Sequence, residues 1–393
     1  MHFSRASLHP EFVTTPAHRD LVRASMTAFR RRLLRPMPPS RAPAPAAALA
    51  APLGASFVVP LSTVSMNGNF DSYIHVQFPT TGDAIQDTLL VDSGNSMMII
   101  PNGEALVGVP GYAVLGTATE PWGCPANVVK GPLEIATSDG GLYRIDDCVF
   151  YACTGDNPTS GGRTANFGTG RISPWSSSGW NRPPRLGVTM QSPLSYGTTY
   201  PFAEFVYAPA DTMFSIAVEP LVTHESQMVL SKSQPPGYTM MSIIENLEWM
   251  SVVPKSLAIG DTTTPWPGTA NRPIAMVDTG GGPVFLSDPN GAIYSKTWPD
   301  AVTCPAWASS SQGCNCVSDT LVLGLAGSGD AEAYAYSIDT SQMPAVAGLT
   351  GVFCKVNAYM MGQQGMNIGG ISVLFNRILV DYSGTRVGMK PTA

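Results

Sequence analysis

The chain has 393 residues, of which 44% are hydrophobic and only 13% are charged, and its formal net charge is −6. An acidic chain of this kind is a poor partner for nucleic acid, and no run of about 18 apolar residues is present to span a membrane. The length allows two or three domains. The 39 glycines and 35 prolines, set among short Val-, Ile-, Thr- and Tyr-rich runs, predict an all-β chain rich in turns.

Residues 1–54 differ in composition from the rest of the chain. They hold eight arginines against two acidic residues, and apolar residues recur at helical spacing from Val22 to Leu33. This pattern predicts a short basic amphipathic helix, which ends at the prolines after Arg35 and leads into a Pro- and Ala-rich linker. A propeptide lying on the acidic body, an organelle-targeting presequence and a disordered tail all fit. A secretory signal peptide does not, because no apolar core segment follows the arginines.

Strand patterns begin at Phe57 and continue to the C-terminal end. A helix or turn is expected near residues 288–298. Apolar runs bounded by turn residues predict strands at 57–61, 72–78, 133–136, 142–145, 148–152, 202–206, 213–218, 227–230, 248–259, 274–277, 320–325, 332–338, 377–382 and 386–389.

Two segments of the chain share one pattern. Leu-Leu-Val-Asp92 is followed by Ser-Gly and a second apolar run, and Ala-Met-Val-Asp278 is followed by Thr-Gly and another apolar run. Each apolar strand delivers a carboxylate to a fixed point, the hydroxyl can hydrogen-bond locally, and glycine lets the backbone turn tightly. One such tripeptide is typical of an ordinary turn. Two copies, separated by almost half the chain, indicate a duplicated lobe.

The order of these motifs resembles that of the pepsin-family aspartic peptidases. Asn166-Phe167-Gly168 is similar to the family's hydrophobic-hydrophobic-glycine segment, with asparagine as a departure. Residues 247–260 resemble the strand pair that opens the second lobe, and residues 368–388 are similar to the C-terminal signature. The resemblance covers about residues 57–391.

The resemblance implies an all-β, bilobal fold. Two β-barrel lobes related by a pseudo-twofold axis, at 55–210 and 211–393, would flank a central peptide-binding cleft. Each lobe would supply one catalytic aspartate, Asp92 or Asp278, at the base of that cleft. The residues that the resemblance implies at the substrate are Ser93, Gly94, Asn95, Trp122, Gly123, Thr279, Gly280 and Gly281.

The chain departs from the family pattern around both motifs. Asn95 stands where serine is usual, and Gly281-Gly282 replace a pair that usually carries hydroxyls. The nearest equivalent of the Tyr-Gly in the family's flap is Trp122-Gly123, whose indole N–H can donate a hydrogen bond but cannot accept one. These departures bear on activity more than on the fold.

Two carboxyl groups suffice for peptide hydrolysis without a metal or a cofactor. Held within hydrogen-bonding distance, they cannot both ionise comfortably, so one keeps a proton while the other acts as a base. Asp92 and Asp278 are expected to hold a water molecule between them, one taking its proton and the other polarising the peptide carbonyl. A coupled pair titrates as a unit, so neither role is assigned to one residue.

Seven cysteines leave the covalent pairing open. Cys148 with Cys153 could close a small loop, and Cys314 or Cys316 could reach Cys354. A zinc site at the cysteines from 304 to 316 lacks both a nearby histidine and paired spacing. Paired cysteines would favour secretion or an oxidising, acidic compartment, and organelle import stays open.

Two functions compete for this sequence. The first is an aspartic endopeptidase, synthesised with a propeptide, that acts as a monomer on peptide or protein substrates. The second is a catalytically silent binding or inhibitor protein on the same fold. The two aspartates favour the enzyme, whereas Gly281-Gly282 and the absent flap tyrosine favour the binding protein. A carbohydrate-active enzyme depends on the separation of the carboxyl groups, and a Ser-His-Asp site at His224 lacks a nucleophile signature.

Overall fold

The structure, a computed structural model, describes most of the predicted strands. The predicted N-terminal helix, the strand at 202–206, the helix or turn at 288–298 and the lobe boundary at 210/211 lie outside the described residues. No helix in the described part of the chain is long and apolar enough to cross a membrane. The described residues are 57–66, 69–94, 98–119, 124–156, 165–168, 213–218, 226–231, 235–244, 251–265, 274–280, 285–287, 315–327, 334–339, 353–356, 365–369, 375–381 and 386–391.

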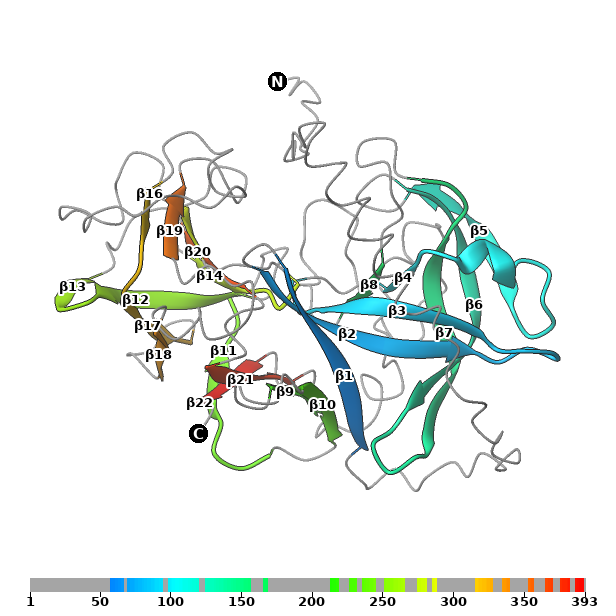
Figure 1. Cartoon of the computed structure of the whole chain (residues 1–393), viewed down its shortest axis with the longest axis horizontal. Helices are drawn as coiled ribbons and strands as arrows, with labels where there is room; N and C mark the ends of the chain where they lie inside the picture. Colours follow the sequence, from blue (N-terminus) through cyan, green and yellow to red (C-terminus); the bar gives the residue numbers. More distant parts are fainter. Residues whose placement is uncertain are drawn as a thin grey trace, which may run out of the picture. The chain divides into compact units, whose positions relative to one another are not determined.

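The first sheet has thirteen strands within the described ranges (Figure 1). A further pairing between β2 and β6 closes six of them, β2, β3, β8, β4, β7 and β6, into a ring. The short 3-10 helix η1 (Gly103–Leu106) follows β4. In sheet order the strands are β11 (Thr239–Ser242), β22 (Arg386–Pro391), β21 (Asn376–Asp381), β9 (Met213–Val218), β10 (Ser226–Ser231), β1 (Phe57–Met66), β2 (Asn69–Phe78), β3 (Ile85–Asp92), β8 (Asn166–Gly168), β4 (Met98–Ile100), β7 (Leu142–Cys153), β6 (Pro125–Ala136) and β5 (Ala113–Thr119).

The second sheet contains nine strands of the described chain (Figure 1). In sheet order they are β16 (Asn315–Val317), β19 (Phe353–Val356), β15 (Phe285–Ser287), β20 (Gly365–Ile368), β14 (Ile274–Val277), β12 (Ser251–Ile259), β17 (Thr320–Ala326) and β18 (Tyr334–Asp339), with β13 (Thr262–Pro265) paired to β12. The all-β fold class predicted from composition is confirmed.

The two sheets repeat one local topology around the aspartate motifs. In the first, β3 pairs in parallel with β8, β8 pairs antiparallel with β4, and β4 pairs in parallel with β7. In the second, β14, β20, β15 and β19 make the same three pairings in the same order. This repetition agrees with the duplication that the two Asp motifs indicate.

Strand β1 links two parts of the first sheet. Its residues 57–61 pair with β10, and its residues 62–66 pair with β2 of the closed ring. Strand β9 in turn pairs with β10 and with β21, so the C-terminal strands share a sheet with the first strand of the chain.

Alternating apolar side chains build the core beneath the first Asp motif. In β3, Leu89 and Val91 are fully buried, whereas Thr88 is exposed and Leu90 is only partly buried. The rings of Phe78 and Phe150 pack with centroids 5.2 Å apart, and the Tyr112 ring lies 6.4 Å from Phe78. Burial of each such ring contributes about 2–3 kcal/mol, which fixes the strand that carries Asp92.

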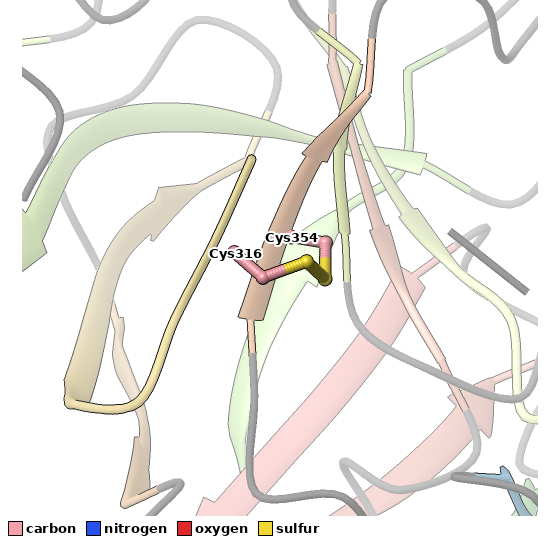
Figure 2. The surroundings of a disulfide bond; sticks show 2 residues. All are labelled: Cys316 and Cys354. Atoms are coloured by element: carbon pink, nitrogen blue, oxygen red, sulfur yellow. A yellow bond between two sulfur atoms is a disulfide. The ribbon is translucent and has the colours of Figure 1, made fainter. Parts of the chain in front are cut away.

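One of the expected disulfides is present. Cys316 on β16 lies directly opposite Cys354 on β19, and their sulfur atoms are bonded (Figure 2). This confirms one of the two pairings predicted for Cys354. The predicted pairing of Cys148 with Cys153 is wrong, because both lie on the single extended strand β7, about 16 Å apart along it, which is too far for a disulfide.

Candidate active site

Asp92 and Asp278 lie at the ends of two buried strands. Asp92 is the last residue of β3 and is buried, and half-buried Asp278 follows the fully buried β14. The backbone N–H of Asp278 donates to Ile368 O at 3.1 Å, which extends the β14–β20 ladder to the aspartate. Apolar burial therefore sets the position of each carboxyl group, as the sequence pattern predicts.

Hydroxyl groups join the two loops reciprocally. Ser93 N–H donates to Thr279 Oγ1 at 2.9 Å, and Thr279 N–H donates to Ser93 Oγ at 3.0 Å. Each hydroxyl then donates to a backbone carbonyl of the other segment: Ser93 Oγ to Val277 O at 3.0 Å, and Thr279 Oγ1 to Val91 O at 2.9 Å. The expectation of a local role for these hydroxyls is wrong, since all four bonds cross between the loops.

The carboxyl groups of Asp92 and Asp278 are hydrogen-bonded to each other. The glycines that follow them allow this approach. A Cβ on Gly94 would lie 2.5 Å from Asp278 Oδ1, and a Cβ on Gly280 would lie 2.6 Å from Asp92 Cγ. Each glycine is thus required by the aspartate of the opposite loop.

The surroundings of Asp92 favour its protonated form. Burial raises the pKa of its carboxyl well above the usual range, and the charge of Asp278 raises that pKa further. Two donors act in the opposite direction, because hydrogen bonds to a carboxylate favour its charged form. They are Asn166 Nδ2, which is 2.6 Å from Asp92 Oδ2, and Gly94 N–H, which is 2.8 Å from Asp92 Oδ1.

Asn367 makes the matching contact in the second half of the chain. Its Nδ2 donates to Asp278 Oδ2 at 2.8 Å. Sequence reasoning treated Asn166 only as a departure from the family pattern and did not single out Asn367. The repeated tripeptides Asn166-Phe-Gly and Asn367-Ile-Gly are the signal that could have identified both.

A third carboxyl group, that of Asp71 on β2, interacts electrostatically with Asp278. Burial raises the pKa of Asp71 to about 6 and the charge of Asp278 adds to this, while a hydrogen bond from Tyr73 Oη, 3.4 Å from Asp71 Oδ2, opposes it. No sequence pattern selects Asp71, because it lies on an ordinary alternating strand and is far along the chain from Asp278.

The structure describes half of the predicted substrate contacts. Ser93, Gly94, Thr279 and Gly280 lie at the loop junction, and the side chains of Ser93 and Thr279 are buried there. Their contact with substrate stays a prediction. Asn95, Trp122, Gly123 and Gly281 lie outside the described residues, as does His224.

His75 does not form a Ser-His-Asp arrangement. Its side chain is exposed on β2, with Nε2 2.7 Å from Ser62 Oγ and Nδ1 3.0 Å from Thr88 Oγ1. A catalytic triad needs a carboxylate at the second ring nitrogen, where this histidine has a hydroxyl.

No family model matches the chain, and no curated protein sequence matches it. Solved structures do match. The crystal structure of edgp aligns with 14% identity and a TM-score of 0.56 over 86% of this chain and 95% of that one. The crystal structure of basic 7S globulin from soybean aligns with 12% identity and a TM-score of 0.52 over 86% of this chain and 97% of that one. At these identities the alignments show the fold alone, and that fold is pepsin-like.

Proposed function

We propose that the chain is an aspartic endopeptidase that hydrolyses peptide bonds through water activated by Asp92 and Asp278. The observation that carries this proposal is the hydrogen bond between the two carboxyl groups, with Asp92 buried and its pKa raised. Two carboxyl groups that share one proton supply both a general base and a general acid at the same pH, as peptide hydrolysis requires.

The chemistry follows from the shared proton. A water molecule held by the pair loses a proton to the ionised carboxylate as its oxygen attacks the peptide carbonyl carbon. The protonated carboxyl stabilises the carbonyl oxygen of the resulting tetrahedral intermediate. Cleavage of the C–N bond then transfers a proton to the leaving nitrogen, which releases an amine and a carboxylic acid. The pair titrates as a unit, so the two roles are properties of the pair.

The loop junction supports this chemistry by holding both acids in place. The four crossing hydrogen bonds of Ser93 and Thr279 link the backbones on either side of the pair. Little reorganisation is therefore needed when charge develops on the substrate, and preorganised polar groups of this kind contribute strongly to catalysis.

A catalytically silent binding protein on the same fold is the second candidate. Gly281 and Gly282 favour it, because they provide no side-chain donors where the resemblance implies hydroxyls. In that case the cleft would bind a peptide or a protein partner without hydrolysing it.

Cleavage of a denatured protein between pH 3 and 7, with and without a pepstatin-type inhibitor, separates the two candidates. We expect inhibitor-sensitive cleavage that falls by about 100- to 10,000-fold in Asp92→Asn and Asp278→Asn. Asp87→Asn is the matched control, since Asp87 lies on the same strand but binds Asn102, with Asn102 Nδ2 2.7 Å from Asp87 Oδ1. No cleavage at any pH, even by a chain from which residues 1–54 have been removed, would refute the peptidase proposal.

A further inference from the structure

The two asparagines that contact the aspartates occupy equivalent places in the two sheets. Asn166 on β8 lies opposite Leu90 of β3, and Asn367 on β20 lies opposite Met276 of β14. Leu90 and Met276 are each two residues before an aspartate. Residues two apart along a strand share a face, so each asparagine reaches forward to the carboxyl group at the end of its parallel neighbour. The two amide contacts, at 2.6 and 2.8 Å, are therefore a repeated feature.

The amide orientation matches an ionised carboxyl group. Each Nδ2 donates to the Oδ2 atom of its aspartate, and a donor at this place stabilises the carboxylate over the acid. The two residues after Gly280 are glycines, which carry no side-chain donor. A neighbouring strand therefore provides Asp278 with a side-chain donor.

Structural stability does not account for these asparagines. Asn166 is 3% exposed and Asn367 is 0% exposed, and the Oδ1 atom of each is buried without a hydrogen-bond partner in the described part of the chain. A buried acceptor without a partner is destabilising, and asparagine is disfavoured in strands. An apolar side chain of similar volume would suit both positions better if packing alone mattered.

We propose that Asn166 and Asn367 are a matched pair of positioning residues, each holding the Oδ2 atom of one aspartate so that the dyad keeps one ionised carboxyl at acidic pH. The effect of the asparagines on the ionisation of the two carboxyl groups does not depend on the proposed function. The effect on catalysis rests on the proposed peptidase function.

Asn166→Leu and Asn367→Leu remove the donors while keeping the volume. In each variant the carboxyl groups become harder to ionise, so both limbs of the pH–activity profile move upward, by about one to two pH units, because a hydrogen bond to a charged group and a pKa unit have similar energies. Asn166→Ala, which also lacks the amide donor and introduces no new charge, is expected to shift the profile in the same direction and serves if the leucine variant does not fold.

Asn376→Leu is the matched control. Asn376 is also buried on a strand, but its Nδ2 donates to Ser337 O at 3.1 Å and its Oδ1 accepts from Tyr334 Oη at 2.7 Å, both remote from the aspartates along the chain. Its replacement should lower the melting temperature and leave the pH–activity profile unmoved.

A second readout separates this inference from the proposed function. Carbon-13 labelling of aspartate side chains, with signals assigned through Asp92→Asn and Asp278→Asn, follows the carboxyl titration without any substrate. An upward shift in the asparagine variants supports the positioning role even if the chain cleaves nothing. Folded Asn166→Leu and Asn367→Leu variants that titrate like the wild type would overturn it, even if the wild type is an active peptidase.

Discussion

The junction between the two aspartate loops should depend on the Ser93 hydroxyl. Ser93→Ala removes two of the four crossing hydrogen bonds, the one from Ser93 Oγ to Val277 O and the one from Thr279 N–H to Ser93 Oγ. The bond from Ser93 N–H to Thr279 Oγ1 remains, because it uses the backbone of residue 93. The substitution therefore leaves a buried N–H and a buried carbonyl without these partners.

The expected cost follows from the burial of the junction. Each lost hydrogen bond contributes about 1 kcal/mol, and leaving the buried N–H of Thr279 without its acceptor adds about 1–3 kcal/mol. Ser93 is fully buried and Thr279 is 2% exposed, so water does not readily replace the hydroxyl. We expect the free energy of unfolding to fall by about 3–5 kcal/mol, equivalent to roughly 4–6 °C in melting temperature for a chain of this length.

Urea unfolding followed by circular dichroism measures this loss. Ser251→Ala is the matched control, because Ser251 is equally buried but its hydroxyl has no hydrogen-bond partner within the described residues, so its removal should cost little. Ser93→Thr keeps the hydroxyl and should lose less than half as much stability as Ser93→Ala. If Ser93→Ala unfolds within about 0.5 kcal/mol of the wild type, or no differently from Ser251→Ala, the crossing bonds do not hold the loops together.

Three further predictions concern separate features. Gly94→Ala should abolish cleavage, because its Cβ would lie 2.5 Å from Asp278 Oδ1 and would push the carboxyl groups apart. Asp71, whose pKa in the folded state is raised to about 6, binds its proton more tightly there than in the unfolded state. The free energy of unfolding should therefore fall, by up to about 3 kcal/mol, as the pH rises from about 4 to about 6. Asp71→Asn should remove that loss, which urea unfolding at pH 4 and pH 7 measures. Replacing Cys316 and Cys354 together by serine should cost about 4 kcal/mol, given their sequence separation of 38 residues.

The first two of these predictions have control variants. Gly82→Ala should be active, since a Cβ there would meet only Thr80 Oγ1, at 3.9 Å. An active Gly94→Ala variant would contradict the close approach of the loops. Ser72→Ala, next to Asp71 on β2, removes no titratable group and should leave the pH dependence of stability intact. An Asp71→Asn variant with the wild-type pH dependence would contradict the assignment to Asp71, and a serine double variant as stable as the wild type would contradict the role of the disulfide.

Local sequence patterns carry enough information to predict the framework of the site. The apolar runs before Asp92 and Asp278 become β3 and β14, with bounds at 274–277 for the second as predicted. This works because strand burial follows from the alternation and length of apolar runs. Which of Cys314 and Cys316 bonds to Cys354 depends on the register between β16 and β19, which is a long-range property that the local sequence does not determine.

The missed features all depend on contacts between residues far apart in the chain. The Ser93 hydroxyl binds a segment 184 residues away, and Asn367 binds an aspartate 89 residues away. A turn motif predicts a local partner for the hydroxyl, and no periodicity predicts which side chain will meet a carboxyl group across a parallel pairing. The prediction of a Cys148–Cys153 loop failed for a related reason, since the segment between them continues as strand β7.

Titration of the two aspartates in the wild type and in Asp278→Asn tests the central claim most directly. If Asp92 and Asp278 share a proton, the labelled carboxyl carbons of the wild type titrate in two coupled steps, with one proton retained well above the usual pKa of aspartate. In Asp278→Asn the pKa of Asp92 should then fall, because the charge of Asp278 no longer raises it. Two independent titrations near the ordinary value, unchanged by the substitution, would contradict the account.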